Sequence, residues 1–135
     1  MTEYLQPTVL LYGMHEPRRL AAIRAYLRTA GIRALEVPDT DWEQSLGALL
    51  ELPGFAQSSA ALPGPEPREE MLVMFAFRGQ MLGELLQFFR NRGLRPVSLK
   101  AMVTDTNVCW SGTRLQQELR LERAAIESAK KREPI

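Results

Sequence analysis

The chain has 135 residues, 45% hydrophobic and 24% charged, with a formal net charge of +1 at pH 7. These values are typical of one soluble globular domain and argue against nucleic-acid binding, which usually needs a basic surface. A single cysteine excludes an internal disulfide, and no apolar run approaches the ~20 residues that span a bilayer. We therefore expect a cytoplasmic protein that does not cross a membrane.

The first half of the sequence alternates between strand and helix patterns. Residues 8–12 form an apolar run of strand-forming side chains that ends at a glycine. Pro17 suits a first helical position, and apolar residues follow at helical spacing until Gly31, which suits a helix end. Residues 33–37 alternate as a short half-buried strand. Asp41 is a credible N-cap for a helix over residues 41–52.

A proline-rich segment separates the two halves. Residues 53–67 contain four of the nine prolines, two glycines and several small residues. This composition predicts a loop, which is longer than most connections inside a compact domain. It is either a tolerated insertion or a lid.

The second half repeats the order of strand, helix and strand. Residues 71–77 form an apolar strand pattern, and a helix with leucines at helical spacing follows and closes at Gly93. Residues 97–104 alternate between apolar and mixed positions, which predicts a strand with two distinct faces. The last helix starts near Thr113, which forms a capping-box pattern with Gln116.

The two halves align with each other without a gap. An offset of 62 residues superposes Gly31 on Gly93 and pairs the apolar positions of the two first strands and the two helices. We therefore interpret residues 1–135 as a single domain made of two similar strand–helix–strand halves, at 8–37 and 71–104.

The pattern predicts an α/β fold of four strand–helix units, which form a small, mainly parallel four-stranded sheet with helices on both faces. The first and third strands are apolar throughout, as central strands of such a sheet are, which favours the order 2-1-3-4. The alternative is a ferredoxin-like α+β plait, which also has two βαβ halves with strands one and three in the centre. The helix over residues 41–52 argues against the plait.

In a parallel sheet the carboxyl ends of strands one, three and four meet at one edge, where open α/β sheets bind ligands. The candidate ligand-binding residues at that edge are His15, Arg78, Lys100, Thr104, Asp105, Thr106, Asn107 and Trp110. In the plait, strand four runs antiparallel to strand one and this composite site does not form.

Each candidate also has an ordinary structural explanation. His15 is either a general base or a surface histidine at a helix start. Lys100 is either a desolvated catalytic amine or an edge-strand lysine that discourages pairing with another sheet. Asp105 and Asn107 cap helices and form turns in many proteins, and Trp110 either anchors the last helix or floors a pocket.

Several chemistries lack the residues they need. One histidine and one cysteine cannot close a zinc site, and Cys109 is flanked by apolar residues that favour burial over nucleophilic reactivity. There is no phosphate-binding glycine motif, no G-x-S-x-G and no C-x-x-C. We therefore expect neither a metal nor a cofactor.

Residues Lys100, Ala101, Thr104, Asn107 and Trp110 form a K-A-x-x-T-x-x-N-x-x-W pattern. Together with the apolar strands at 10–13 and 74–77 and the helix at 115–122, this pattern resembles a small family of bacterial, typically clostridial, proteins known only as a domain of unknown function. The resemblance covers most of the chain and implies a bacterial cytosolic origin. It carries no activity.

These observations predict a non-catalytic module of the bacterial cytosol that binds either a small ligand or a protein partner. The alternative is a small enzyme whose site at the carboxyl edge of the sheet uses His15 or Lys100 as the base. A homodimer formed through an uncovered face of the sheet is a third possibility.

Overall fold

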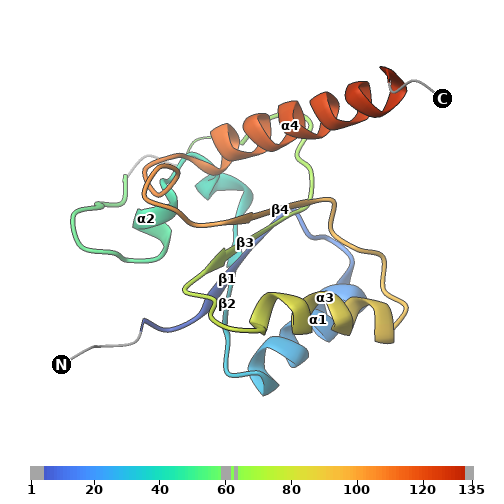
Figure 1. The fold of residues 1–135 in the computed structure, drawn as a ribbon. Helices are drawn as coiled ribbons and strands as arrows, with labels where there is room; N and C mark the ends of the chain where they lie inside the picture. Colours follow the sequence, from blue (N-terminus) through green and yellow to red (C-terminus); the bar gives the residue numbers. More distant parts are fainter. Residues whose placement is uncertain (1–4, 59–61, 63, 133–135) are drawn as a thin grey trace.

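Strands alternate with helices through residues 5–58, 62 and 64–132, the part of the chain that the computed structural model describes (Figure 1). The elements, in chain order, are β1 (Thr8–Tyr12), α1 (Pro17–Thr29), β2 (Arg33–Val37), the 3-10 helix η1 (Asp39–Asp41), α2 (Leu46–Leu49), β3 (Met71–Phe75), α3 (Met81–Asn91), β4 (Leu99–Met102) and α4 (Gly112–Arg132).

The four strands form one mixed sheet in the order β2-β1-β3-β4. β1 pairs with β2 in parallel, and β3 pairs with β4 in parallel. The two central strands, β1 and β3, are antiparallel, so Tyr12 lies opposite Met71 and Thr8 opposite Phe75. The predicted α/β class and strand order are confirmed, with one antiparallel pair in an otherwise parallel sheet.

The sequences of the strands match their positions in the sheet. Every residue of β1 is buried, and β3 is buried from Met71 to Met74. Apolar side chains on both sides of a strand need cover on both faces, which only a central strand in a covered sheet receives. β2 and β4 lie at the edges and carry more exposed residues.

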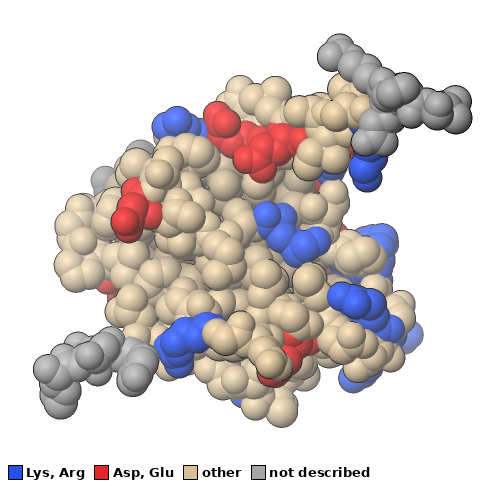
Figure 2. Space-filling model, in the orientation of Figure 1, with Lys and Arg blue, Asp and Glu red and all other residues tan. Residues whose placement is uncertain are grey.

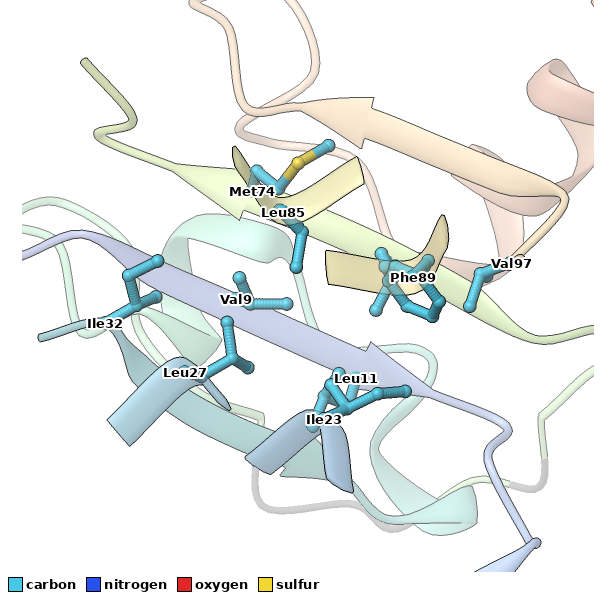
Figure 3. Packing of buried hydrophobic residues seen from close by; sticks show 10 residues of the cluster. Val9, Leu11, Ile23, Leu27, Ile32, Met74, Leu85, Phe89 and Val97 are labelled. Carbon is cyan, nitrogen blue, oxygen red and sulfur yellow. The ribbon is translucent and has the colours of Figure 1, made fainter. Parts of the chain in front are cut away.

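The helices α1 and α3 cover one face of the sheet, where Figure 3 shows their side chains pointing toward those of β1 and β3. Each helix contributes two fully packed residues at i and i+4 spacing, which lie on the same side of a helix. They are Ile23 and Leu27 of α1, and Leu85 and Phe89 of α3.

The helices α2 and α4 cover the opposite face. Leu46 of α2 and Leu115 of α4 pack in a second core with Tyr12 and Trp42, whose rings meet edge to face with their centroids 4.9 Å apart. In an α+β plait the helices gather on one face of the sheet. Helices on both faces therefore confirm the predicted α/β layering over the plait.

The second helix starts later than predicted, whereas the last helix starts close to the predicted Thr113 but is capped by another residue. Asp41 belongs to η1, and α2 begins only after Ser45, whose Oγ accepts a hydrogen bond from the Ala48 amide at 3.1 Å. The last helix starts one residue before Thr113, with Ser111 Oγ accepting from the Arg114 amide at 3.1 Å. In both places a serine satisfies a free amide of the first helical turn.

β4 is shorter than predicted, and its first predicted residue faces the other way. Val97 packs in the core under α1 and α3, whereas Leu99 packs in the core under α4. The predicted face that grouped Val97 with Leu99 is therefore wrong, because Val97 precedes the strand and does not follow its alternation.

The proline-rich segment at 53–67 is described except at residues 59–61 and 63. Its first part is held by Gln44, a buried side chain whose amide donates to the Ser58 carbonyl oxygen at 2.8 Å and accepts from the Ser58 amide at 2.9 Å. A lid function for this segment stays a prediction.

Candidate interaction edge at β4

The predicted composite site at one edge of the sheet does not form. Because β1 and β3 are antiparallel, the carboxyl end of β1 lies beside the start of β3, at Met71. The carboxyl ends of β3 and β4 lie together at the other end, since Met74 pairs with Met102. His15 therefore lies at the opposite end of the sheet from Arg78 and from the residues at 104–107.

His15 is exposed at the end of β1. It lines a hollow of about 370 Å³ between the ends of β1 and β2, together with Met14, Glu36 and Asp39. Within the described residues, no group of three or more histidine, cysteine or carboxylate side chains could hold a metal ion.

Arg78 is exposed after β3, and its Nη1 donates to the Leu5 carbonyl oxygen at 3.2 Å. It lies at the same end of the sheet as Thr104, as the parallel pairing of β3 and β4 requires. The two residues share that end, whereas His15 does not.

Thr104 and Asn107 bind each other in a reciprocal pair of hydrogen bonds. The Thr104 amide donates to Asn107 Oδ1 at 2.8 Å, and the Asn107 amide donates to Thr104 Oγ1 at 3.1 Å. Asn107 Nδ2 also donates to the Met102 carbonyl oxygen at 3.0 Å. Asn107 is only 8% exposed, so its amide shapes the turn after β4 and has little access to a ligand.

Asp105 and Thr106 form the exposed tip of this turn. The Thr106 carbonyl oxygen lies 3.7 Å from the Sγ of Cys109, which is exposed. Burial of that thiol, expected from its apolar neighbours, is therefore wrong.

Trp110 anchors the connection between β4 and α4. Its ring is half-buried against the second core, and the Arg114 guanidinium lies 4.3 Å from the ring centroid. Its carbonyl oxygen accepts from the Leu46 amide at 2.9 Å, and the Val108 carbonyl oxygen accepts from the Gly47 amide at 2.8 Å. These bonds fasten residues 103–111 onto the start of α2.

β4 forms an open edge of the sheet. The Val103 amide donates to the Met74 carbonyl oxygen at 2.8 Å, which fixes the direction of the backbone groups along the strand. In a parallel strand the amide and the carbonyl oxygen of one residue point to the same side, and that side alternates from residue to residue. Because Val103 points toward β3, the backbone groups of Lys100 and Met102 point away from it. Asn107 occupies the Met102 carbonyl oxygen, which leaves two amides and one carbonyl oxygen of β4 without a partner among the residues that the structure describes.

A mostly apolar groove lies on the α3 side of this edge. It has a volume of about 230 Å³ and is lined by Leu86, Phe89, Arg90, Leu94, Pro96, Val97 and Lys100. The ammonium group of Lys100 donates to the Val97 carbonyl oxygen at 2.6 Å, so the side chain folds back along its own strand.

A second, charged groove of about 310 Å³ lies on the α4 side. Its walls are the start of β4 and the second half of α4, and they include Leu119, Ile126, Arg123 and Lys130. Ile126 is 57% exposed although it continues the apolar side of α4 that carries Leu119.

The carboxylate of Glu69 holds α4 over this second groove. It pairs with Arg120 at 2.9 Å and with Arg123 at 2.5 Å, and Arg123 also donates to Ser98 Oγ at 2.8 Å. The hydrogen bond from Arg123, followed by that from Arg120, keeps the pKa of Glu69 below its usual value against the opposing effect of burial. This network ties α4 to the start of both β3 and β4.

The opposite edge of the sheet is better protected by charge. β2 carries Arg33 and Glu36, and they pair with Glu51 at 3.6 Å and with Arg24 at 2.9 Å. Charged side chains on an edge strand discourage another strand from pairing with it. β4 has only Lys100, and its charge is turned back onto Val97.

The sequence reading singled out Lys100 in this region and missed the apolar groove. The groove combines residues from α3, from the connection at 94–97 and from β4, and no local pattern joins them. For the charged groove on the α4 side a signal was present in Ile126, an apolar residue that continues the helical stripe into a segment rich in charge.

Residues 70–126 match the family model of DUF3783, a domain of unknown function. The predicted similarity to such a family is therefore confirmed for this part of the chain. No curated protein and no solved structure matches the chain significantly.

The matched segment contains β3, α3, β4 and most of α4. It includes the open edge, the whole apolar groove and much of the charged one. In addition, none of the helices in the described ranges is long and apolar enough to span a membrane.

Proposed function

We propose that this protein is a non-catalytic interaction module that binds an extended segment of a partner protein along the edge of β4. The observation that carries the proposal is the row of open backbone groups at Lys100 and Met102, which lies between two grooves. An added strand forms main-chain hydrogen bonds with such an edge, and its alternating side chains enter the space on either side.

The hydrogen-bonding capacity of the edge suits a short segment. Two open amides and one open carbonyl oxygen provide up to three main-chain hydrogen bonds, each worth about 1 kcal/mol net. Binding of useful strength then depends on side chains that enter the grooves, which gives such a module its sequence preference.

The enzyme alternative has less support. It required His15 near the residues at 104–107, and these lie at opposite ends of the sheet. The other proposed base, Lys100, carries its ammonium group on the Val97 carbonyl oxygen. We place the module in the bacterial cytosol, because its K-A-x-x-T-x-x-N-x-x-W pattern resembles that of bacterial proteins and its single cysteine suits a reducing compartment.

The proposal is tested by selecting binders from a random peptide library displayed on phage, with the whole protein immobilised. We expect enriched peptides that bind wild type and Met102→Ala but not Met102→Pro, because proline removes an outward amide and alanine retains it. Circular dichroism establishes that each variant is folded.

A change on the peptide side makes the test independent of the folding of Met102→Pro. Two versions of a selected peptide are compared, one methylated at its odd-numbered and one at its even-numbered backbone amides. Methylation should abolish binding in one version, whose modified amides face β4, and leave it in the other. Binding that survives in both methylated versions, or an absence of enriched peptides, would overturn the proposal.

Light scattering of the protein alone tests the other occupant of the edge, a second copy. A dimer at micromolar concentration that Met102→Pro dissociates would assign β4 to self-association and overturn the peptide assignment. We expect a monomer in both proteins.

A further inference from the structure

The geometry points to a particular class of partner segment: an extended stretch with an apolar side chain in the α3-side groove and an acidic side chain two positions away. This inference rests on the proposed function, because it needs the segment to run along β4. It specifies what the segment contains and which residues of the protein select it.

The apolar part follows from the lining of the groove. Leu86, Phe89, Leu94, Pro96 and Val97 surround a space of about 230 Å³, which has room for one aliphatic or aromatic side chain. Side chains on one side of a strand are two residues apart. A strand beside β4 therefore presents one side chain to this groove and its second neighbours to the rim.

The acidic part follows from the charges at the rim. Only Arg90 and Lys100 carry charge among the residues that line the groove. Arg90 is exposed in the last turn of α3 and forms no ion pair or side-chain hydrogen bond with the residues that the structure describes. The ammonium group of Lys100 retains donors beyond its bond to Val97.

Figure 2 shows basic side chains between α4 and α3 on this face of the molecule, acidic ones gathered along α4, and a further acidic group over the helices below. The α4-side groove favours neither acidic nor basic side chains of a partner, since Glu122 and Glu127 accompany Arg123 and Lys130 there. The preference for an acidic segment therefore comes from the α3 side.

The test measures binding of a peptide selected from the phage library by fluorescence polarisation. Enriched sequences should carry an apolar residue with Asp or Glu two positions away. Replacing those acids by Lys should weaken binding to wild type about tenfold, as should replacing the apolar residue by serine.

Charge reversal in the protein tests the same contact from the other partner. Arg90→Glu should weaken the acidic peptide about tenfold and strengthen the Lys peptide. Arg92→Glu is the matched control, because it makes the same change in the same turn but lies in the hollow between α1 and α3. It should alter binding less than twofold.

The outcomes separate this inference from the function on which it rests. Enriched peptides without acids, or equal effects of Arg90→Glu and Arg92→Glu, overturn the charge selection. Sensitivity to Met102→Pro and to backbone methylation would then still support strand addition. Without any enriched peptide, both proposals are wrong.

Discussion

Ser45 and Ser111 pair with each other through an isolated antiparallel bridge, and each caps the helix that follows it. The Oγ of Ser45 accepts from Ala48 and that of Ser111 from Arg114, both at 3.1 Å. The starts of α2 and α4 therefore meet at one point over the sheet, each with its first turn satisfied locally.

Loss of either cap should destabilise the fold. We expect Ser45→Ala and Ser111→Ala each to lower the free energy of unfolding by about 1 kcal/mol, because an amide of the first turn loses its acceptor. Urea unfolding followed by circular dichroism measures the change. Ser45→Thr and Ser111→Thr retain the hydroxyl, and losses as large as those of the alanine variants would contradict the capping role.

The side chain of Asn107 should matter more for stability than any of its exposed neighbours. Asn107→Ala removes the partners of the Thr104 amide and the Met102 carbonyl oxygen, and we expect a loss of about 2 kcal/mol. Thermal and urea unfolding measure it. Thr106→Ala, at the exposed tip of the same turn, should change stability by less than about 0.5 kcal/mol. A stable Asn107→Ala variant would return this residue to the list of ligand-binding candidates.

The order and layering of the sheet were predictable because they follow from which strands are apolar on both sides. β1 and β3 read as central strands, and the helical spacing of Leu85 and Phe89 placed α3 against them. The direction of β3 relative to β1 could not be predicted from the sequence in this way. A buried run is equally apolar in either direction, and the long segment at 53–67 allows both.

The candidate site failed for the same reason. Its residues were chosen at strand ends, so their proximity depended entirely on the direction of β3. The K-A-x-x-T-x-x-N-x-x-W pattern was recognisable, yet four of its residues make local bonds: Lys100 to Val97, Thr104 to Asn107, and Trp110 to Asn107. The apolar groove depends on three segments that only the folded chain brings together.

Acid should weaken the attachment of α4 through Glu69. Its pKa is lowered in the folded protein, mainly by the hydrogen bond from Arg123, so its contribution to stability is present above the usual pKa of 4.5 and is lost as the pH falls through the folded pKa. Glu69→Gln should cost about 1 kcal/mol at pH 7, as expected for a partly exposed network. Urea unfolding at pH 7 and pH 3 should show this difference shrinking in acid.

Glu66→Gln is the control for this change, since Glu66 lies nearby with 81% of its side chain exposed and pairs with Arg68 at 3.3 Å. It should have little effect at either pH. A deficit of Glu69→Gln that stays constant from pH 7 to pH 3 would mean that the carboxylate charge is not what holds α4.

Two helical glycines should respond in opposite directions to alanine. A Cβ at Gly112 would lie 2.4 Å from Cε2 of Tyr12 and 3.2 Å from the Trp42 carbonyl oxygen. Tyr12 is fully buried and its ring is fixed edge to face against Trp42, so it has no free space into which to turn. We expect Gly112→Ala to cost about 2 kcal/mol, as overpacking of a core does.

Gly83, in the first turn of α3, has no atom within 4 Å of the position of a Cβ. There alanine should stabilise the protein by about 0.5–1 kcal/mol, because it restricts the unfolded chain and favours the helix. Urea unfolding of both variants measures the contrast. If Gly112→Ala is as stable as wild type, the start of α4 does not press on Tyr12 as closely as described, and the second core has room that this packing excludes.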